Sequence, residues 1–158
     1  MAREYVISAG GITLANQAVT LVFINPGTTA SLEILRCWVA QSANATSAQQ
    51  RVQLNTQVTA FPTLTSATPA KTKLLDPVSA IIGGTAGAAG TAGTNASAEG
   101  AGTKTVMHSD AFNVLNGWLW VPTPEERIFV PGGGIIGLKF PDAPTAATYY
   151  AGFIFGED

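Results

Sequence analysis

The sequence predicts an all-β protein, an antiparallel β-sandwich or jelly roll of about eight strands in a single domain over residues 1–158. Apolar residues recur with a period of two in short segments rich in Val, Ile, Thr and aromatic residues, and Gly, Pro and Asn separate these segments. No window carries a helical stripe of apolar residues, although 76–82 could form one helical turn. An apolar content of 46% supplies enough side chains for a core.

The first expected strands are an apolar segment near the N-terminus, 19–24 and 32–41. The segment 19–24 ends at Asn25-Pro26-Gly27, a turn sequence in which Pro presets φ and Gly accepts a positive φ. The clearest strand covers 51–60, where polar residues alternate with Val, Leu, Thr and Ala. This alternation predicts one face in the core and one polar face.

Five further strands are expected in the C-terminal part, at 104–107, 112–121, 127–130, 135–140 and 147–155.

Two of these strands are apolar on both faces. Trp118 and Trp120 share one face of their strand, and Leu119 and Val121 make the opposite face apolar as well. The strand 147–155 repeats the pattern with Tyr, Phe and Ile side chains on both faces. Such strands need cover on both sides, which predicts a second sheet inside and an arm or a neighbouring subunit outside.

Residues 83–103 form a 21-residue run with seven Gly, seven Ala, four Thr and no apolar side chain larger than Ala. Fixing its backbone costs on the order of 20–40 kcal/mol, and small side chains recover little of this through burial. The run therefore predicts a long flexible loop or arm that a neighbouring chain orders, or else a flexible linker without a role. Deletion of 85–101 is expected to leave the sandwich folded and to weaken assembly.

Charged residues make up only 11% of the chain, against about 25% in an average soluble protein. Because surface charge keeps proteins apart, this composition predicts that much of the surface contacts other protein. The pI of about 5.3 and the absence of a Lys/Arg cluster argue against nucleic-acid binding. No apolar run is long enough for a membrane span, and no signal peptide is apparent, so we expect synthesis in a cytoplasm.

The candidates for chemistry are few. His108 is the only histidine, whereas a metal-dependent jelly-roll enzyme needs two or three, so neither a metal nor another cofactor is expected. In a strand, His108 and Asp110 point to one face and Ser109 to the other, so the three cannot form a catalytic relay. An enzyme could still combine the single Cys37 with His108, but no local motif supports this pair. The sequence predicts no catalytic residue.

A resemblance rests on the order of several segments. These are the alternating strand at 50–54, the Gly/Ala/Thr run, the segment TVMHSDAFN at 105–113, and WLWVP at 118–122 followed by Pro124-Glu125. Together they resemble the small β-sandwich decoration (cement) proteins encoded beside the major capsid gene of tailed bacteriophages. The resemblance implies a non-enzymatic homotrimer that is made in the host cytoplasm and binds the major capsid protein on the outside of the virion.

Candidate contacts with the shell lie in the N-terminal residues 2–7 and in the 83–103 run, and the tryptophan strand provides further ones. The individual candidates are Arg3, Tyr5, Gly87, Gly90, Gly93, Asn95, Trp118 and Trp120. The alternative function is a carbohydrate- or receptor-binding module of a phage tail or fibre, in which aromatic side chains stack on sugar rings. The residues for that role are Trp118, Trp120, Tyr149 and Tyr150.

Overall fold

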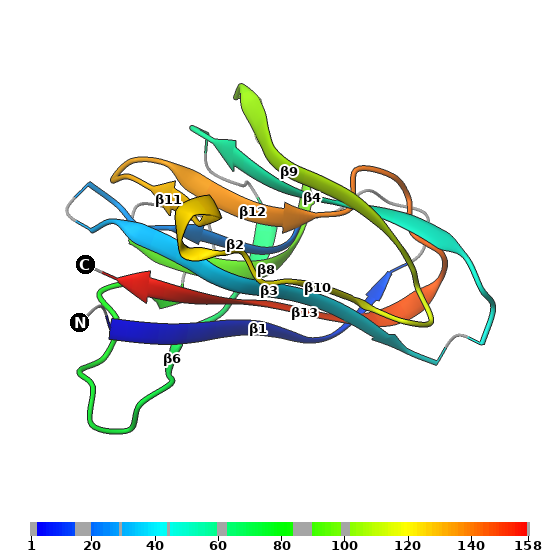
Figure 1. Cartoon of the computed structure of the whole chain (residues 1–158), viewed down its shortest axis with the longest axis horizontal. Helices are drawn as coiled ribbons and strands as arrows, with labels where there is room; N and C mark the ends of the chain where they lie inside the picture. Colours follow the sequence, from blue (N-terminus) through cyan, green and yellow to red (C-terminus); the bar gives the residue numbers. More distant parts are fainter. Residues whose placement is uncertain are drawn as a thin grey trace.

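The computed structural model describes residues 3–14, 20–28, 30–43, 45–59, 63–83, 90–98 and 102–157. The all-β prediction is confirmed, because two mainly antiparallel sheets pack against each other (Figure 1). The described residues form thirteen strands rather than about eight, and several of the additional strands are only two to four residues long.

The first sheet has six strands in the order β10-β3-β13-β1-β6, and β11 also pairs with β3. β1 and β13 pair along most of their length, from Arg3 opposite Glu157 to Leu14 opposite Ala147. The strands are β1 (Arg3–Leu14), β3 (Leu32–Ser42), β6 (Ala70–Lys71), β10 (Trp118–Trp120), β11 (Ile128–Val130) and β13 (Ala147–Glu157).

The second sheet has seven strands in the order β5-β8-β2-β12-β4-β9, and β7 pairs with β8 in parallel. The strands are β2 (Thr20–Asn25), β4 (Gln49–Gln57), β5 (Thr63–Ser66), β7 (Ile82–Gly83), β8 (Thr91–Ala98), β9 (Lys104–Asn113) and β12 (Ile135–Lys139). A 3₁₀ helix, η1 (Pro124–Glu126), precedes β11.

The core lies between the two sheets and is rich in aromatic rings. Tyr149 and Phe153 on β13 are fully buried, as the alternation of that strand predicts. The ring of Phe140 meets Tyr149 edge-on at 5.0 Å between centroids. Cys37 on β3 belongs to the same core and is fully buried.

The expectation of a flexible loop over the whole of 83–103 is wrong, because Thr91–Ala98 is strand β8 within the second sheet. β8 pairs with β2 on one side and with β5 on the other. Backbone hydrogen bonds on both edges and close packing offset the cost of ordering it. A Cβ on Gly93 would lie 2.7 Å from atoms of both Phe23 and Leu64, so the missing side chain makes room for theirs. Residues 84–89 and 99–101 lie outside the described part.

The strands expected at 104–107 and 112–121 are divided differently in the structure. β9 extends from Lys104 to Asn113 because the long strand β4 pairs with both of its ends, and the register shifts by one residue at Met107. In β4, Val52 and Leu54 are buried as predicted, but Asn55 and Gln57 on the expected polar face are buried too.

Residues 71–82 form a loop that projects from β6 beyond the edge of the first sheet, where it is drawn in green (Figure 1). The helical turn expected at 76–82 is absent from these described residues. A turn closes instead at Lys73, whose carbonyl accepts a hydrogen bond from the amide of Asp76 at 3.1 Å.

Candidate interaction surfaces

The N-terminal candidates lie on β1, between β13 and the short edge strand β6 of the first sheet. Arg3 is exposed opposite Glu157 of β13. Tyr5 is fully buried, and its hydroxyl donates to the carbonyl of Pro77 at 3.2 Å. Its ring is therefore part of the core and is not available to a partner.

The candidates in the glycine-rich run fall mainly on β8. Gly93 is buried, Asn95 is half-buried with a positive φ of 53°, and Gly90 precedes the strand. Gly87 lies outside the described residues. The packing of Gly93 inside the sheet gives it a structural role.

The tryptophans at 118 and 120 point toward the interior and contact His108 on β9. Trp118 is only 7% exposed, and the centroid of the His108 ring lies 6.1 Å from that of Trp118 and 5.4 Å from that of Trp120. Asp110 accepts a hydrogen bond from Nε1 of Trp118 at 3.0 Å. This cluster joins the edge of the second sheet to the edge of the first.

The shared face of His108 and Asp110 is confirmed by these contacts. The hydrogen bond from Trp118, together with one from the amide of Ala111, lowers the pKa of the Asp110 carboxyl below its usual value. Burial raises the pKa of the Cys37 thiol well above its usual value, which opposes the thiolate that a nucleophile needs. Nε2 of His108 is enclosed without a hydrogen-bond partner among the described residues.

The sequence predicts that the strands containing Leu119 and Tyr150 are apolar on their outer side as well. That side contributes to an apolar surface on the outside of the first sheet. We call it the outer apolar face and define it by Val6, Trp38, Leu119, Tyr150 and Ile154. Leu119 is 62% exposed and Tyr150 is 42% exposed, and the other three are half-buried.

The register of the strands places these five side chains together. Leu119 is opposite Trp38, and Val6 is opposite Ile154. The ring of Trp38 covers Gly152, since a Cβ there would overlap Cζ2 of the ring. The guanidinium of Arg36 lies 5.6 Å from the centroid of the same ring. Strict alternation in β3, with Cys37 inside, was the sequence signal that could have located Trp38 on the outside.

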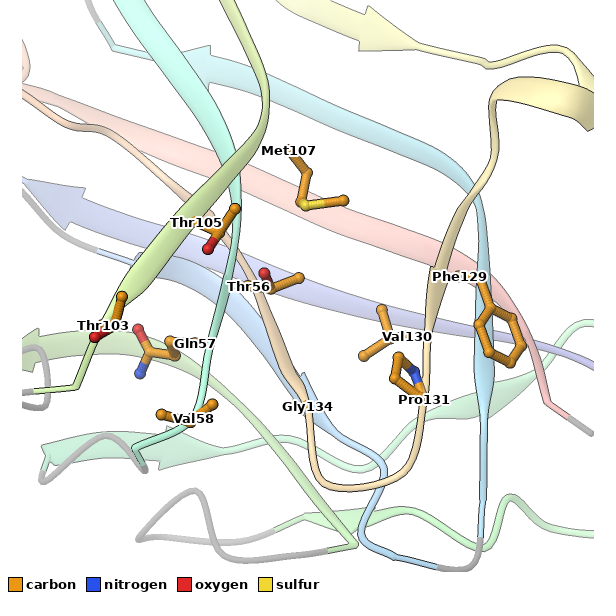
Figure 2. Close-up of a pocket in the computed structure, with 10 residues that line it drawn as sticks. All are labelled: Thr56, Gln57, Val58, Thr103, Thr105, Met107, Phe129, Val130, Pro131 and Gly134. Carbon is orange, nitrogen blue, oxygen red and sulfur yellow. The ribbon is translucent and has the colours of Figure 1, made fainter.

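A second surface is a groove at the open edge of the sandwich, between β4 and β9 on one side and β11 on the other (Figure 2). We call it the edge groove. It has a volume of about 360 Å³ and mainly apolar walls. Met107 and Val130 point into it from opposite walls (Figure 2). The lining residues are Thr56, Gln57, Val58, Thr103, Thr105, Met107, Phe129, Val130, Pro131 and Gly134.

Among the described residues, no three His, Cys, Asp or Glu side chains lie close enough together to hold a metal ion. The same part of the chain contains no helix of the length and apolarity needed to cross a membrane.

No protein-family model and no curated protein matches the sequence. A structural comparison pairs the chain with the structure of infectious bursal disease virus Gx strain at 15% sequence identity and a TM-score of 0.13. The pairing covers 99% of this chain, which spans only 39% of that chain. A TM-score this low carries no argument about fold or function.

Proposed function

We propose that the chain is a non-enzymatic capsid decoration protein, which binds the major capsid protein on the outside of a tailed-phage head as a homo-oligomer. The observation that carries the proposal is the outer apolar face. A decoration protein needs contact area and complementary shape rather than reactive groups. A cluster of exposed apolar side chains on a rigid sheet meets that need, since such clusters on soluble proteins mark interaction sites.

We further propose that the sandwich is a jelly roll, the fold class used by many viral capsid proteins. The strand order supports this assignment. β1, β13, β3 and β10 are neighbours in the first sheet, and β2, β12, β4 and β9 are neighbours in the second. The chain moves to the other sheet from β1 to β2, from β2 to β3 and from β3 to β4, and again from β9 to β10 and from β12 to β13. Such crossing between sheets is typical of Greek-key connections.

The rim of the outer apolar face contains charges that could orient a partner. Arg127 pairs with Glu33 at 3.4 Å beside the exposed Phe129, and Arg36 lies over Trp38. An apolar centre with a charged rim is the usual arrangement of a protein interface. The virion exterior is therefore the proposed location.

The test is co-sedimentation of the purified protein with empty heads of the phage that encodes it. Leu119→Asp combined with Tyr150→Asp should weaken binding at least tenfold, because it places charge where apolar surface is buried. Val106→Asp is the matched control, since Val106 is 49% exposed but lies on β9 in the other sheet. Unchanged binding of the double variant, or no binding of the parent protein, contradicts the proposal.

A second candidate function is carbohydrate binding, and the placement of Trp38 favours it. The ring covers Gly152 at the sheet surface and the guanidinium of Arg36 lies over the ring, so the two groups together could contact a sugar. Tyr150, on the same outer face, could add a second aromatic contact. Quenching of tryptophan fluorescence by a glycan, lost in Trp38→Leu, would support this function over capsid binding.

A further inference from the structure

We infer that copies of the chain associate head to tail, with the projecting turn Lys73–Asp76 of one copy inserted into the edge groove of the next. We call this segment the leucine turn, because its two central residues are Leu74 and Leu75. The inference deepens the proposed function and rests on it only for the expectation of a homo-oligomer.

The leucine turn presents unusually exposed apolar side chains. Leu74 is 90% exposed and Leu75 is 97% exposed, and Val78 just after the turn is 76% exposed. Single apolar residues on a surface are common, but two adjacent leucines at the tip of a projecting loop form an apolar knob that water solvates poorly. Such a knob is suited to insertion into an apolar groove.

The loop that carries the turn is held in place at its base. The amide and the hydroxyl of Thr72 both donate to the carbonyl of Glu4, at 3.1 Å and 2.9 Å. The carboxylate of Glu157 accepts hydrogen bonds from the Ser79 hydroxyl at 2.6 Å and from the Ala80 amide at 2.8 Å. A loop that is already ordered loses little entropy on binding, which favours a docking role.

The edge groove matches the leucine turn in chemistry. Its walls are mainly apolar, and Met107, Val58 and Phe129 around it are 47%, 75% and 59% exposed. Met107 is unbranched and flexible, so it can adapt to an inserted side chain. The groove lies between two strand edges that are unpaired in the described residues, those of β9 and β11, so backbone groups are also available to a partner.

Charge complementarity points to the same pairing. Lys71 precedes the leucine turn, and Lys73 is the first residue of the turn, where its ammonium lies 4.0 Å from the carboxylate of Glu4. Glu125 and Glu126 are exposed in η1, the short helix that precedes β11, and they lie within four residues of the groove-lining Phe129 in the chain. Lysines on the inserted loop would therefore approach carboxylates at the groove, which favours a second copy as the occupant.

The positions of the two features decide the symmetry of the contact. The leucine turn follows β6, at one edge of the first sheet, whereas β10 and β11 form the opposite edge beside the groove. A copy cannot fill its own groove with a turn on its opposite side. Contact between two different surfaces is heterologous, and it closes into a ring when the rotation permits.

The experiment measures solution mass by light scattering for the full chain and two variants. The parent should exceed the monomer mass of 16.2 kDa, and both Leu74→Asp/Leu75→Asp and Met107→Asp should dissociate to that mass at the same concentration. Each change should raise the dissociation constant about a hundredfold or more, since it replaces buried apolar area with charge. Circular dichroism spectra of the variants should match that of the parent.

Mixing the two variants gives the decisive result. Leu74→Asp/Leu75→Asp keeps an intact edge groove, and Met107→Asp keeps an intact leucine turn. One heterologous contact can therefore form between the two variants, and their mixture should contain a dimer. Three results overturn the inference. They are a parent protein that is monomeric, an oligomer that persists in Leu74→Asp/Leu75→Asp, and a mixture of the two variants that stays monomeric. If Met107→Asp dissociates the oligomer but Leu74→Asp/Leu75→Asp does not, another segment fills the groove, and this result also overturns the inference.

Leu119→Asp separates this inference from the proposed function. It changes the outer apolar face, and its oligomer mass should equal that of the parent while its binding to phage heads falls. The parent and all variants could fail to bind heads while the parent still forms an oligomer that Leu74→Asp/Leu75→Asp dissociates. This result would reject the decoration function and support the head-to-tail contact.

Discussion

At the scale of single residues, two glycines allow aromatic rings to pack directly against the backbone. Gly93 on β8 leaves room for Phe23 and Leu64, and Gly152 on β13 leaves room for the ring of Trp38. In both places a neighbouring strand supplies the side chain that covers the glycine, so a small residue in this sequence marks close packing rather than a flexible segment.

Gly93→Val should destabilise the protein by about 1–3 kcal/mol, because the new side chain overpacks the sheet. A Cβ at this position would lie 2.7 Å from Phe23 and 2.8 Å from the carbonyl oxygen of Thr65, which belongs to the backbone. Chemical denaturation measures the change. Gly10→Ala is the control, since no atom lies within 4 Å of its Cβ position, and it should change stability far less. Equal effects of the two substitutions would contradict this account of Gly93.

Asp110→Asn should lower stability at pH 7 by about 0.5–1 kcal/mol, because the exposed carboxylate that accepts from Trp118 is partly screened by solvent. The pKa of Asp110 is lowered in the folded protein. As pH falls below about 4, the unfolded chain therefore binds a proton at this carboxyl before the folded chain does. The stabilisation is present above that pH and is lost as pH falls through the folded pKa.

Thermal unfolding at pH 7 and at pH 3 tests the role of Asp110. The difference in Tm between the parent and Asp110→Asn should shrink at the lower pH. The side chain of Ser109 points to the other face of β9. The difference in Tm between the parent and Ser109→Ala should therefore not depend on pH. If Asp110→Asn lowers Tm by the same amount at pH 7 and at pH 3, the charge on Asp110 does not contribute to stability.

At the scale of elements, β8 determines how the second sheet holds together. It separates β5 from β2, and it also pairs with β7. Removing it would leave one edge of β2 without hydrogen-bond partners and would expose Phe23 and Ile135, which cluster with Ala96 of β8.

Deletion of 85–101 is therefore expected to abolish cooperative unfolding, contrary to the expectation from composition alone. The deletion removes a strand with two ladders of backbone hydrogen bonds and the buried residues Ala92 and Ala96. The measurement is a thermal melt followed by near-ultraviolet circular dichroism. Leu74→Ser/Leu75→Ser, in the exposed loop between β6 and β7, is the control, and its thermal transition should stay sharp. A deletion variant that unfolds cooperatively would show that the second sheet can fold without β8 between β2 and β5.

The contrast between β8 and the other strands shows what the sequence could predict. Strands with alternating large side chains, such as β3, β12 and β13, were located to within a few residues because their core face is visible in the pattern. β8 could not be recognised, since its small residues are selected by bulky partners on β2 and β5 that are distant in sequence. The outer position of Trp38, in contrast, follows from the alternation within β3, in which Cys37 and Val39 are buried. The leucine turn was missed because two adjacent leucines between charged residues show no period.

At the scale of the whole molecule, the surfaces to which we assign different proposed roles lie apart from one another. The outer apolar face covers one side of the first sheet, and the leucine turn and the edge groove lie at opposite edges of that sheet. This arrangement leaves the face free when copies associate through their edges. A ring built in this way would present several outer faces together, and several weak contacts acting together raise the overall affinity by about 10²–10⁴.

The proposed association would be linked to folding, so the thermal stability of the protein should depend on its concentration. An interaction made only by folded copies stabilises them by an amount that grows with the logarithm of concentration. For a chain of this length we expect Tm to rise by roughly 3–8 °C over a hundredfold increase in concentration. Leu74→Asp/Leu75→Asp should unfold at a Tm that does not change with concentration, whereas Leu119→Asp should keep the dependence of the parent. A parent protein whose Tm is constant over this range would indicate that its folded copies do not associate through any surface.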